Sequence, residues 1–390
     1  MKEIKKGKMA EGILTDEMIE RMRQKIGLKM RLEGYINNEE ATKTAIRRFA
    51  DGIGDGNPLW HDEEYAMTTA YGRIVAPPSW VWSVCAGVQM GWAGLGGFHS
   101  KTEEEFYKPI LLGDKIIPEI IFAGFDGPMP SRFAEQVVKD YYDSMFYNQN
   151  GELVAKIHWW VFRYDRRKAK KSGKYKSIQL PHPWTDEELE KIEEEVLAEE
   201  IRGSNPRYWE DVNVGDEMKP LVKGPIGVTD MVAYIAGGAT PIKYAAHSIA
   251  LREYRNRPAW AFRDPDTHAL EPIFAVHYNK RAANLQGLPF YYDLGIQRQC
   301  WQDQFLTNWA GDNGWLRSSY AEYRSFVYVS DVIWIRGKVT EKYVADDGDY
   351  CVDIETSTVN QRGDNVMPGK ATIALPFKET GASPVEKRLK

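Results

Sequence analysis

The sequence repeats one pattern in its two halves, and this repetition limits the folds that the chain can adopt. Residues 106–114 (FYKPILLGD) resemble residues 323–331 (YRSFVYVSD) at an offset of 217 positions. Residues 148–154 (NQNGELV) resemble residues 360–366 (NQRGDNV) at an offset of 212 positions. Polar turns with Asn and Gly beside runs of β-forming residues are typical of strand–turn–strand units. The sequence therefore predicts two copies of one α+β unit of about 150 residues each.

Length and composition agree with this prediction. A chain of 390 residues is long for one domain and suits two or three. Hydrophobic residues make up 43% and charged residues 27%, so we expect a sizeable core and no extensive disorder. The net charge of −5 argues against nucleic acid or an anionic membrane surface as the main partner, because both require a clustered positive excess. The sequence contains no run of about 20 apolar residues, so no membrane span is predicted.

The start of the chain and the cysteines predict a cytoplasmic location. Residues 1–6 are charged and lack the apolar region of a signal peptide. Cys85, Cys300 and Cys351 are far apart, and no pair has the spacing of metal ligands. We therefore expect reduced thiols.

Hydrophobic periodicity predicts three helices. Residues 12–33 carry apolar side chains at spacings of three and four. The segment 79–96 is apolar throughout, so Trp80–Trp92 should form a core helix that is buried on all sides. A second core helix should begin at Gly295 and carry apolar residues along one side as far as Trp309.

Residues 104–125 and 134–165 alternate apolar and polar residues, as strands do. A charged segment then begins with a basic run and continues into an acidic helix, which Thr185 and Glu188 should open as a capping box. We interpret it as a solvated linker, because the acidic helix nearly cancels the basic run. The predicted boundaries are an N-terminal unit at 1–165, the linker at 166–203, a C-terminal unit at 204–380 and a tail at 381–390.

Residues 54–62 (GDGNPLWHD) form the most unusual motif of the chain. Asp and Asn next to Pro predict a rigid turn, which should hold the Asp55 carboxylate, the Asn57 amide and the His61 imidazole close together. Such a cluster at the mouth of an apolar element suits proton transfer. The simpler interpretation is structural, because these side chains can also bond backbone groups of their own turn.

This motif resembles the signature Gly-Asp-x-Asn-Pro-x-His-x-Asp of the MaoC-like (R)-specific enoyl-CoA hydratases. Residues 76–78 (APP) are similar to the fungal fatty-acid-synthase-type dehydratase branch of that family. The resemblance covers residues 12–165 and 205–377, called the first and second halves below. It implies an α+β tandem hot-dog fold, in which each curved antiparallel sheet wraps around a long core helix. Trp60 stands where the family has its His, and His61 comes one residue late.

The repeat offset extends the resemblance into the second half. Shifted by 217 positions, the family's His falls on His277, and the core helix follows at Gly295. The family's Asp falls on Pro272, and the nearest carboxylate is Glu271. An insertion at 239–270 precedes these residues.

By resemblance, the N-terminus of the core helix faces a thioester carbonyl, where unsatisfied backbone N–H groups stabilise an enolate oxygen. We expect His277 to exchange the proton and the N–H of Gly295 to bind the oxygen. Glu271 should share the reacting water with His277, with Asp264 and Asp266 as alternatives. The other candidates for substrate contacts are Asp55, Asn57, His61, Asn279 and Asp264.

These expectations describe a hydro-lyase that hydrates a 2-enoyl-CoA or dehydrates a 3-hydroxyacyl-CoA. Coenzyme A, or an acyl carrier protein, enters as the handle of the substrate, and we expect neither a metal nor a redox cofactor. The sequence leaves a homodimer open. Two alternatives to the hydro-lyase also stay open. A thioesterase or related lyase can use the same fold, and a non-catalytic thioester-binding or scaffold subunit of a heteromeric dehydratase would explain Trp60 and Pro272.

Overall fold

The computed structural model describes residues 8–172, 175 and 177–390. The charged start at 1–6 and Lys174 of the basic run lie outside the described residues.

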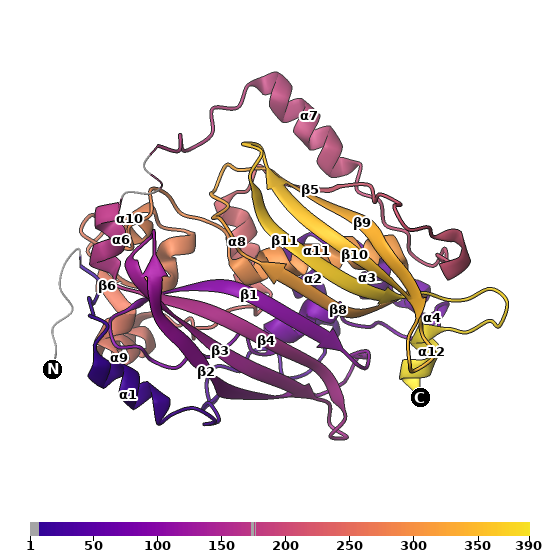
Figure 1. Ribbon diagram of the computed structural model, residues 1–390, viewed down its shortest axis with the longest axis horizontal. Helices are drawn as coiled ribbons and strands as arrows, with labels where there is room; N and C mark the ends of the chain where they lie inside the picture. Colours follow the sequence, from indigo (N-terminus) through magenta and orange to yellow (C-terminus); the bar gives the residue numbers. More distant parts are fainter. Residues whose placement is uncertain (1–7, 173–174, 176) are drawn as a thin grey trace.

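A nine-stranded antiparallel sheet runs through both halves of the chain (Figure 1). Its strand order is β2-β3-β4-β1-β8-β11-β10-β9-β5. The strands of the two halves meet where β1 pairs with β8, with Lys101 opposite Glu322. The strand bounds are Gly96–Phe106 (β1), Ile117–Ser131 (β2), Glu135–Tyr147 (β3), Leu153–Tyr164 (β4), Leu221–Lys223 (β5), Trp315–Glu322 (β8), Ile333–Val344 (β9), Tyr350–Asn360 (β10) and Asn365–Ala374 (β11).

The predicted repeat is confirmed by matching hydrogen bonds in the two halves. In each half an Asn closes a hairpin by accepting two backbone N–H bonds of 3.0 Å, namely Asn148 from Asn150 and Glu152, and Asn360 from Arg362 and Asp364. The Gln that follows each Asn donates a hydrogen bond to an Asp of the same half. Gln149 donates to Asp114, and Gln361 donates to Asp331. The two halves therefore share local geometry as well as sequence pattern.

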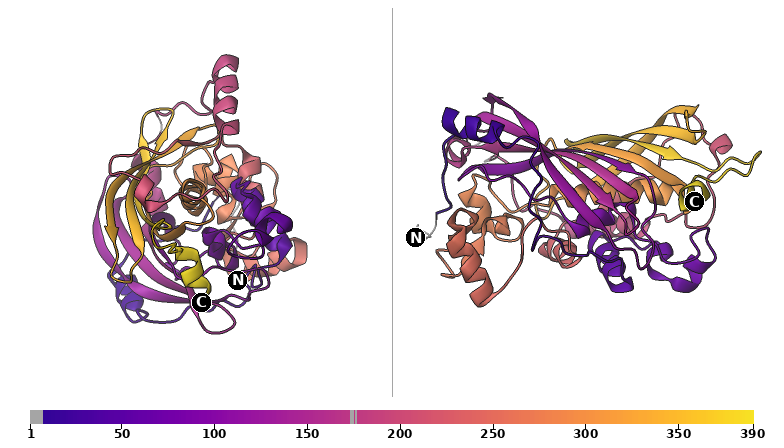
Figure 2. Two further views of the ribbon diagram at one scale, coloured as in Figure 1. Left: turned by 90° about the vertical axis from the view of Figure 1, so that its right-hand side faces the viewer. Right: turned by 90° about the horizontal axis from the view of Figure 1, so that it is seen from below.

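The sheet is curved, and most of the helices gather on one side of it (Figure 2). The longest helix, α11 (Gly295–Ala310), begins where the sequence predicted it. It is buried on most sides, including Cys300 and Trp301, and it contacts β1 of the first half and β8 and β11 of the second half. The predicted α+β architecture, with an antiparallel sheet around a core helix, is therefore present.

Two predicted helices are shorter than the apolar patterns indicated. The helix expected at 12–33 is only α1 (Asp16–Arg23), after which Lys29 bridges to β2. Of the segment Trp80–Trp92, only the 3-10 turn η1 (Pro78–Trp80) and the helix α5 (Val81–Val84) are helical. Gly87 has a φ of 86°, and a Cβ there would lie 2.9 Å from the Trp159 ring. The backbone already leaves the helical region at Cys85, whose φ is −154° and ψ is 105°, and the left-handed φ of Gly87 two residues later favours a residue without a Cβ.

The charged segment forms two helices, α6 (Arg166–Ser172) and α7 (Asp186–Leu197), and the predicted capping box of Thr185 and Glu188 is present. The insertion forms α9 (His247–Asn256) and the small sheet of β6 (Ala261–Arg263) and β7 (Leu270–Pro272). The remaining helical elements are α2 (Lys43–Ile53), α3 (Pro58–His61), α4 (Glu63–Met67), η2 (Trp209–Asp211), α8 (Val228–Ala236), η3 (Pro258–Trp260), η4 (Ile273–His277), α10 (Lys280–Leu285) and α12 (Pro384–Leu389). No helix in the described part of the chain is both long and apolar enough to cross a bilayer.

Candidate active site

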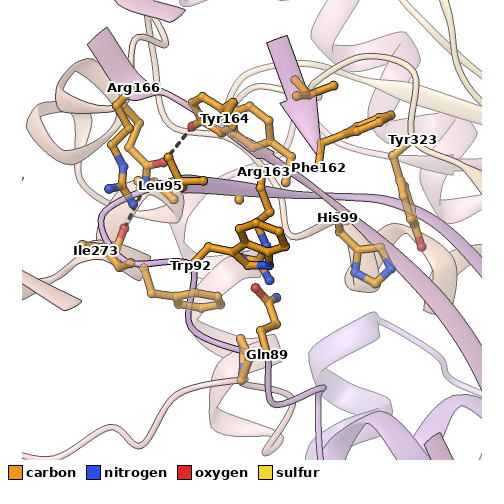
Figure 3. Close-up of a pocket in the computed structure, with 18 of the residues that line it drawn as sticks. Gln89, Trp92, Leu95, His99, Phe162, Arg163, Tyr164, Arg166, Ile273 and Tyr323 are labelled. Carbon is orange, nitrogen blue, oxygen red and sulfur yellow. Dashed lines mark hydrogen bonds between the residues drawn. The ribbon is translucent and has the colours of Figure 1, made fainter. Parts of the chain in front are cut away.

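A cavity of about 810 Å³ lies between β1 of the first half and the N-terminus of α11 in the second half. Figure 3 shows part of its wall, with His99 and Tyr323 side by side and Arg166 and Tyr164 further along. Other parts of the wall come from the loop 86–95, from residues 129–137 and 162–166 of the first half, from the insertion and from η4. The residues that line the cavity include His99, Arg132, Arg257, His277, Asp293, Gly295, Arg298, Tyr323 and Arg324.

The N-terminus of α11 opens into this cavity. Gly295 is its first residue and lines the cavity, and no side chain caps the helix. Uncapped helix N-termini present backbone N–H groups and a partial positive charge, which suit a developing oxyanion. A Cβ added at Gly295 would lie 3.5 Å from the Cβ of His99, an ordinary van der Waals contact, so strand β1 packs directly against the start of the helix.

His277 is a neutral imidazole in the cavity wall. It ends η4 and is 8% exposed. Its Nδ1 lies 3.0 Å from the backbone oxygen of Tyr292. A carbonyl only accepts hydrogen bonds, so Nδ1 carries the proton and Nε2 keeps its lone pair. Burial lowers the pKa of His277 to about 4, so the ring is neutral at ordinary pH and able to accept a proton.

The only carboxylate among the described residues of the cavity wall is Asp293, and Arg298 neutralises it. Arg298 donates from Nε and Nη2 to the two carboxylate oxygens at 2.8 and 2.7 Å, and both side chains are buried. The Nη1 of Arg298 also donates to the backbone oxygens of Ser325 and Val366. This bidentate pair fixes the turn before α11 and engages both carboxylate oxygens of Asp293.

The carboxylates predicted beside His277 lie outside the cavity wall. Asp264 accepts a hydrogen bond of 3.2 Å from Asn279, and Asp266 forms an ion pair with Arg281. Glu271 is on β7, and burial together with the charge of Asp264 raises its pKa. Backbone N–H bonds, first from Thr267, lower the pKa of Asp264.

Asn279 caps α10 by accepting from the backbone N–H of Ala282. The structure therefore brings His277 and Gly295 together at the cavity. It does not bring Glu271, Asp264, Asp266 or Asn279 to it.

The motif of the first half lies at the opposite end of α11. Asn57 donates a hydrogen bond to Asp312, which follows the helix. Both residues line a separate cavity of about 50 Å³. Sixteen helical residues span about 24 Å at 1.5 Å per residue, which separates this motif from the N-terminus of α11. Asp55 accepts from the backbone N–H of Asn57 at 3.0 Å, and His61 Nε2 donates to the backbone oxygen of Asp55 at 2.8 Å. Burial raises the pKa of Asp55 to about 6.

One residue of the large cavity, His99, was not singled out by the sequence. It lies on β1 and faces the start of α11. Burial lowers its pKa to about 3. Its neighbours in the sequence carry no motif, and its position depends on a strand irregularity described below.

Part of the sequence is similar to known proteins. Residues 32–120 match the family described as the FAS1-like, dehydratase domain region. A UPF0336 protein of Parafrankia sp. (strain EAN1pec) is 30% identical over 118 residues, which cover 28% of this chain and 74% of that protein. A UPF0336 protein of Streptomyces avermitilis is 29% identical over 85 residues, or 20% of this chain. The aligned stretch spans 57% of the length of the Streptomyces protein.

Solved structures resemble nearly the whole chain. A MaoC-like dehydratase superposes with a TM-score of 0.63 at 16% identity, covering 91% of this chain and 99% of that one. A putative MaoC domain protein dehydratase of Chloroflexus aurantiacus gives 0.55 at 13% identity, covering 90% and 96%. RV0216, a conserved hypothetical protein of Mycobacterium tuberculosis with a double hot-dog fold, gives 0.51 at 12% identity, covering 90% and 96%. These likenesses show that the chain has the double hot-dog fold.

Proposed function

Because the chain belongs to the UPF0336 family and contains a FAS1-like dehydratase region, we propose that it reversibly hydrates a 2-enoyl thioester. The observation that carries the proposal is the pairing of a neutral imidazole, His277, with the uncapped N-terminus of α11 in one cavity. The first provides a base, and the second provides donors for an oxyanion.

The proposed reaction balances with these two groups. His277 Nε2 takes a proton from water as the water oxygen bonds to Cβ of the enoyl group. The electrons of the double bond move toward the thioester oxygen, which accepts hydrogen bonds from the N-terminus of α11 at Gly295. The imidazolium then returns the proton to Cα, which gives the 3-hydroxyacyl thioester. Dehydration runs through the same steps in reverse.

Coenzyme A is the proposed handle of the substrate. Arg132, Arg257 and Arg324 are exposed and line the cavity, where guanidinium groups suit phosphates. The cavity volume of about 810 Å³ lies in the range typical of small-molecule and cofactor sites. An acyl carrier protein, which presents one phosphodiester, would engage fewer of these cations.

A second candidate is favoured by one observation, the neutralised state of Asp293. A cavity wall whose described residues include no unpaired carboxylate also suits a non-catalytic subunit that binds a thioester and supports a partner enzyme.

The test is the loss of enoyl ultraviolet absorbance from a panel of 2-enoyl-CoA thioesters. Wild type, His277→Gln and the matched control His158→Gln should be compared, because His158 lies on β4 outside the cavity wall. We expect hydration by wild type and His158→Gln, and a loss of about 10² or more in rate for His277→Gln. Release of free thiol would instead identify a thioesterase. Binding without turnover of any thioester would favour the non-catalytic subunit.

A further inference from the structure

We propose that His99 is a second catalytic residue of the cavity, which holds the water molecule that His277 deprotonates. The inference rests on the proposed hydration and adds a residue from the first half to a site otherwise built on the second half. Four observations carry it.

The first observation is a β-bulge that turns His99 into the cavity. In the β1–β4 ladder His99 pairs with Val161 but Lys101 pairs with Trp160, so Ser100 is an extra residue. Residues two apart in a regular strand share a face. Here His99 packs against buried Trp159, whereas the ammonium group of Lys101 lies 4.2 Å from the ring of Trp160 on the outer face. The bulge thus separates the two side chains, as bulges beside functional sites commonly do.

The second observation is a chain of hydrogen bonds that fixes the ring of His99. Its Nε2 lies 2.8 Å from Thr102 Oγ1, which lies 3.0 Å from the Tyr323 hydroxyl. The Tyr323 hydroxyl in turn donates to Gln299 Oε1 at 3.3 Å. The Gln299 amide is oriented because its nitrogen donates to the Glu104 carboxyl group at 3.1 Å as well as to Ser319 Oγ at 2.8 Å.

This chain determines the tautomer of His99. The amide oxygen of Gln299 only accepts, so the single hydroxyl hydrogen of Tyr323 is used there. The hydrogen of Thr102 is then donated to Tyr323, and Nε2 of His99 must donate to Thr102. The three contacts are hydrogen bonds at the same time only in this arrangement. It leaves Nδ1 of His99 with a free lone pair.

The third observation is the position of His99 beside the start of α11. A Cβ added at Gly295 would lie 3.5 Å from the Cβ of His99. The backbone of His99 therefore lies against the end of α11 where the proposed oxyanion forms. Tyr323 packs edge-on against the His99 ring with a centroid distance of 4.9 Å, and Figure 3 shows the two rings adjacent on the cavity wall.

The fourth observation is the absence of a free carboxylate among the described residues of the cavity wall, since Asp293 is bound by Arg298. The attacking water donates one of its hydrogens to His277. Its second hydrogen needs a hydrogen-bond acceptor, because that bond orients the lone pair of the water oxygen toward Cβ of the enoyl group. We assign this acceptor to Nδ1 of His99. The O–H bond to it stays intact, so His99 is neutral throughout, while the proton transferred to His277 is the one that reaches Cα.

Two substitutions at position 99 test the assignment. The side-chain nitrogen of Gln can occupy the place of Nε2 and keep the bond to Thr102, but it leaves no acceptor at Nδ1. The carbonyl of Asn can lie at the place of Nδ1 and keep the acceptor. We expect His99→Gln to lower kcat for hydration by about 10²-fold and His99→Asn by less than about 10-fold. Affinity for a saturated acyl-CoA should change little in either variant, and His158→Gln serves as the matched control.

The outcomes separate this inference from the proposed function. One outcome is that wild type hydrates thioesters, that His277→Gln abolishes the reaction, and that the kcat of His99→Gln stays within about threefold of wild type. In that case the role assigned to His99 is wrong, and the proposed function stands. If His99→Gln loses affinity for the saturated thioester together with kcat, or if Asn is no better than Gln, His99 only shapes the cavity. If wild type hydrates no thioester, both proposals fall.

Discussion

Asn57 in the first half donates a hydrogen bond of 3.1 Å to Asp312, which follows helix α11 in the second half. The same Asn57 caps α3, since its oxygen accepts from the backbone N–H of Leu59 at 3.0 Å. Asp312 also accepts from the hydroxyl of Tyr65. A motif that resembles a catalytic signature therefore connects the two halves about 24 Å from the proposed site.

We predict that Asn57→Ala destabilises the protein by about 1–3 kcal/mol, because a cap is lost and a buried carboxylate loses a donor. Urea unfolding measures this loss. The exposed hairpin residue Asn150 provides the control, and Asn150→Ala should stay within about 0.5 kcal/mol of wild type. Turnover by folded Asn57→Ala should be near that of wild type, and a large fall in kcat without a change in stability would contradict the structural role.

Asp55 should make stability fall as pH rises. Burial raises its pKa to about 6, above the ordinary value of 3.8 that the unfolded chain has. Between these values the folded state binds more protons than the unfolded state, so this group's contribution decreases with rising pH and is least favourable above pH 6. Asp55→Asn removes the ionisation. As the pH rises from 4 to 7, the free energy of unfolding of Asp55→Asn should increase relative to that of wild type by on the order of 3 kcal/mol. Parallel stability curves for the two proteins would contradict the prediction.

The pH dependence of hydration should reflect the neutral state of His277. The active base is the unprotonated ring, and its pKa is lowered to about 4. We therefore expect kcat/KM, which follows the free enzyme, to fall as pH decreases through about 4 and to be nearly unchanged between pH 7 and pH 5. A decline centred on the ordinary histidine value of about 6.5 would show that the base is not this buried ring.

The Asp293–Arg298 pair should be costly to break from one side. Arg298→Met leaves the Asp293 carboxylate buried and unpaired, so we expect a loss of about 3–5 kcal/mol in unfolding free energy. The double variant Asp293→Asn/Arg298→Met removes both charges and should be less destabilised than Arg298→Met. For comparison, Arg23→Met removes the exposed pair with Glu20 and should change stability by at most about 1 kcal/mol. A double variant as unstable as the single one would argue that packing, rather than charge, dominates at this site.

The sequence was sufficient for features that depend on local pattern. The two hairpins with Asn148 and Asn360, the capping box at Thr185 and the start of α11 at Gly295 all follow from residue types at short spacing. Shifting the repeat by its offset was enough to find His277, which lines the cavity.

Other features depend on contacts between distant segments. His99 faces the cavity because of a bulge in the pairing of β1 with β4, and no local pattern encodes that register. Glu271 was expected beside His277 because it is the carboxylate nearest to the shifted position of the family's Asp, but β7 ends at Pro272 and a 3-10 turn follows. Most of the segment Trp80–Trp92 is buried, as predicted from its hydrophobicity, yet the helix ends at Val84 and the backbone is extended at Cys85.

The pairing of β1 with β8 has a consequence for how the proposed site responds to dilution. An enzyme that builds its site from walls on two separate subunits loses that site when its concentration falls below the dissociation constant of the pair. Here the two walls belong to one polypeptide, and a covalent connection makes their association independent of total concentration. His99 and His277 therefore line the cavity in a fixed one-to-one ratio at any protein concentration.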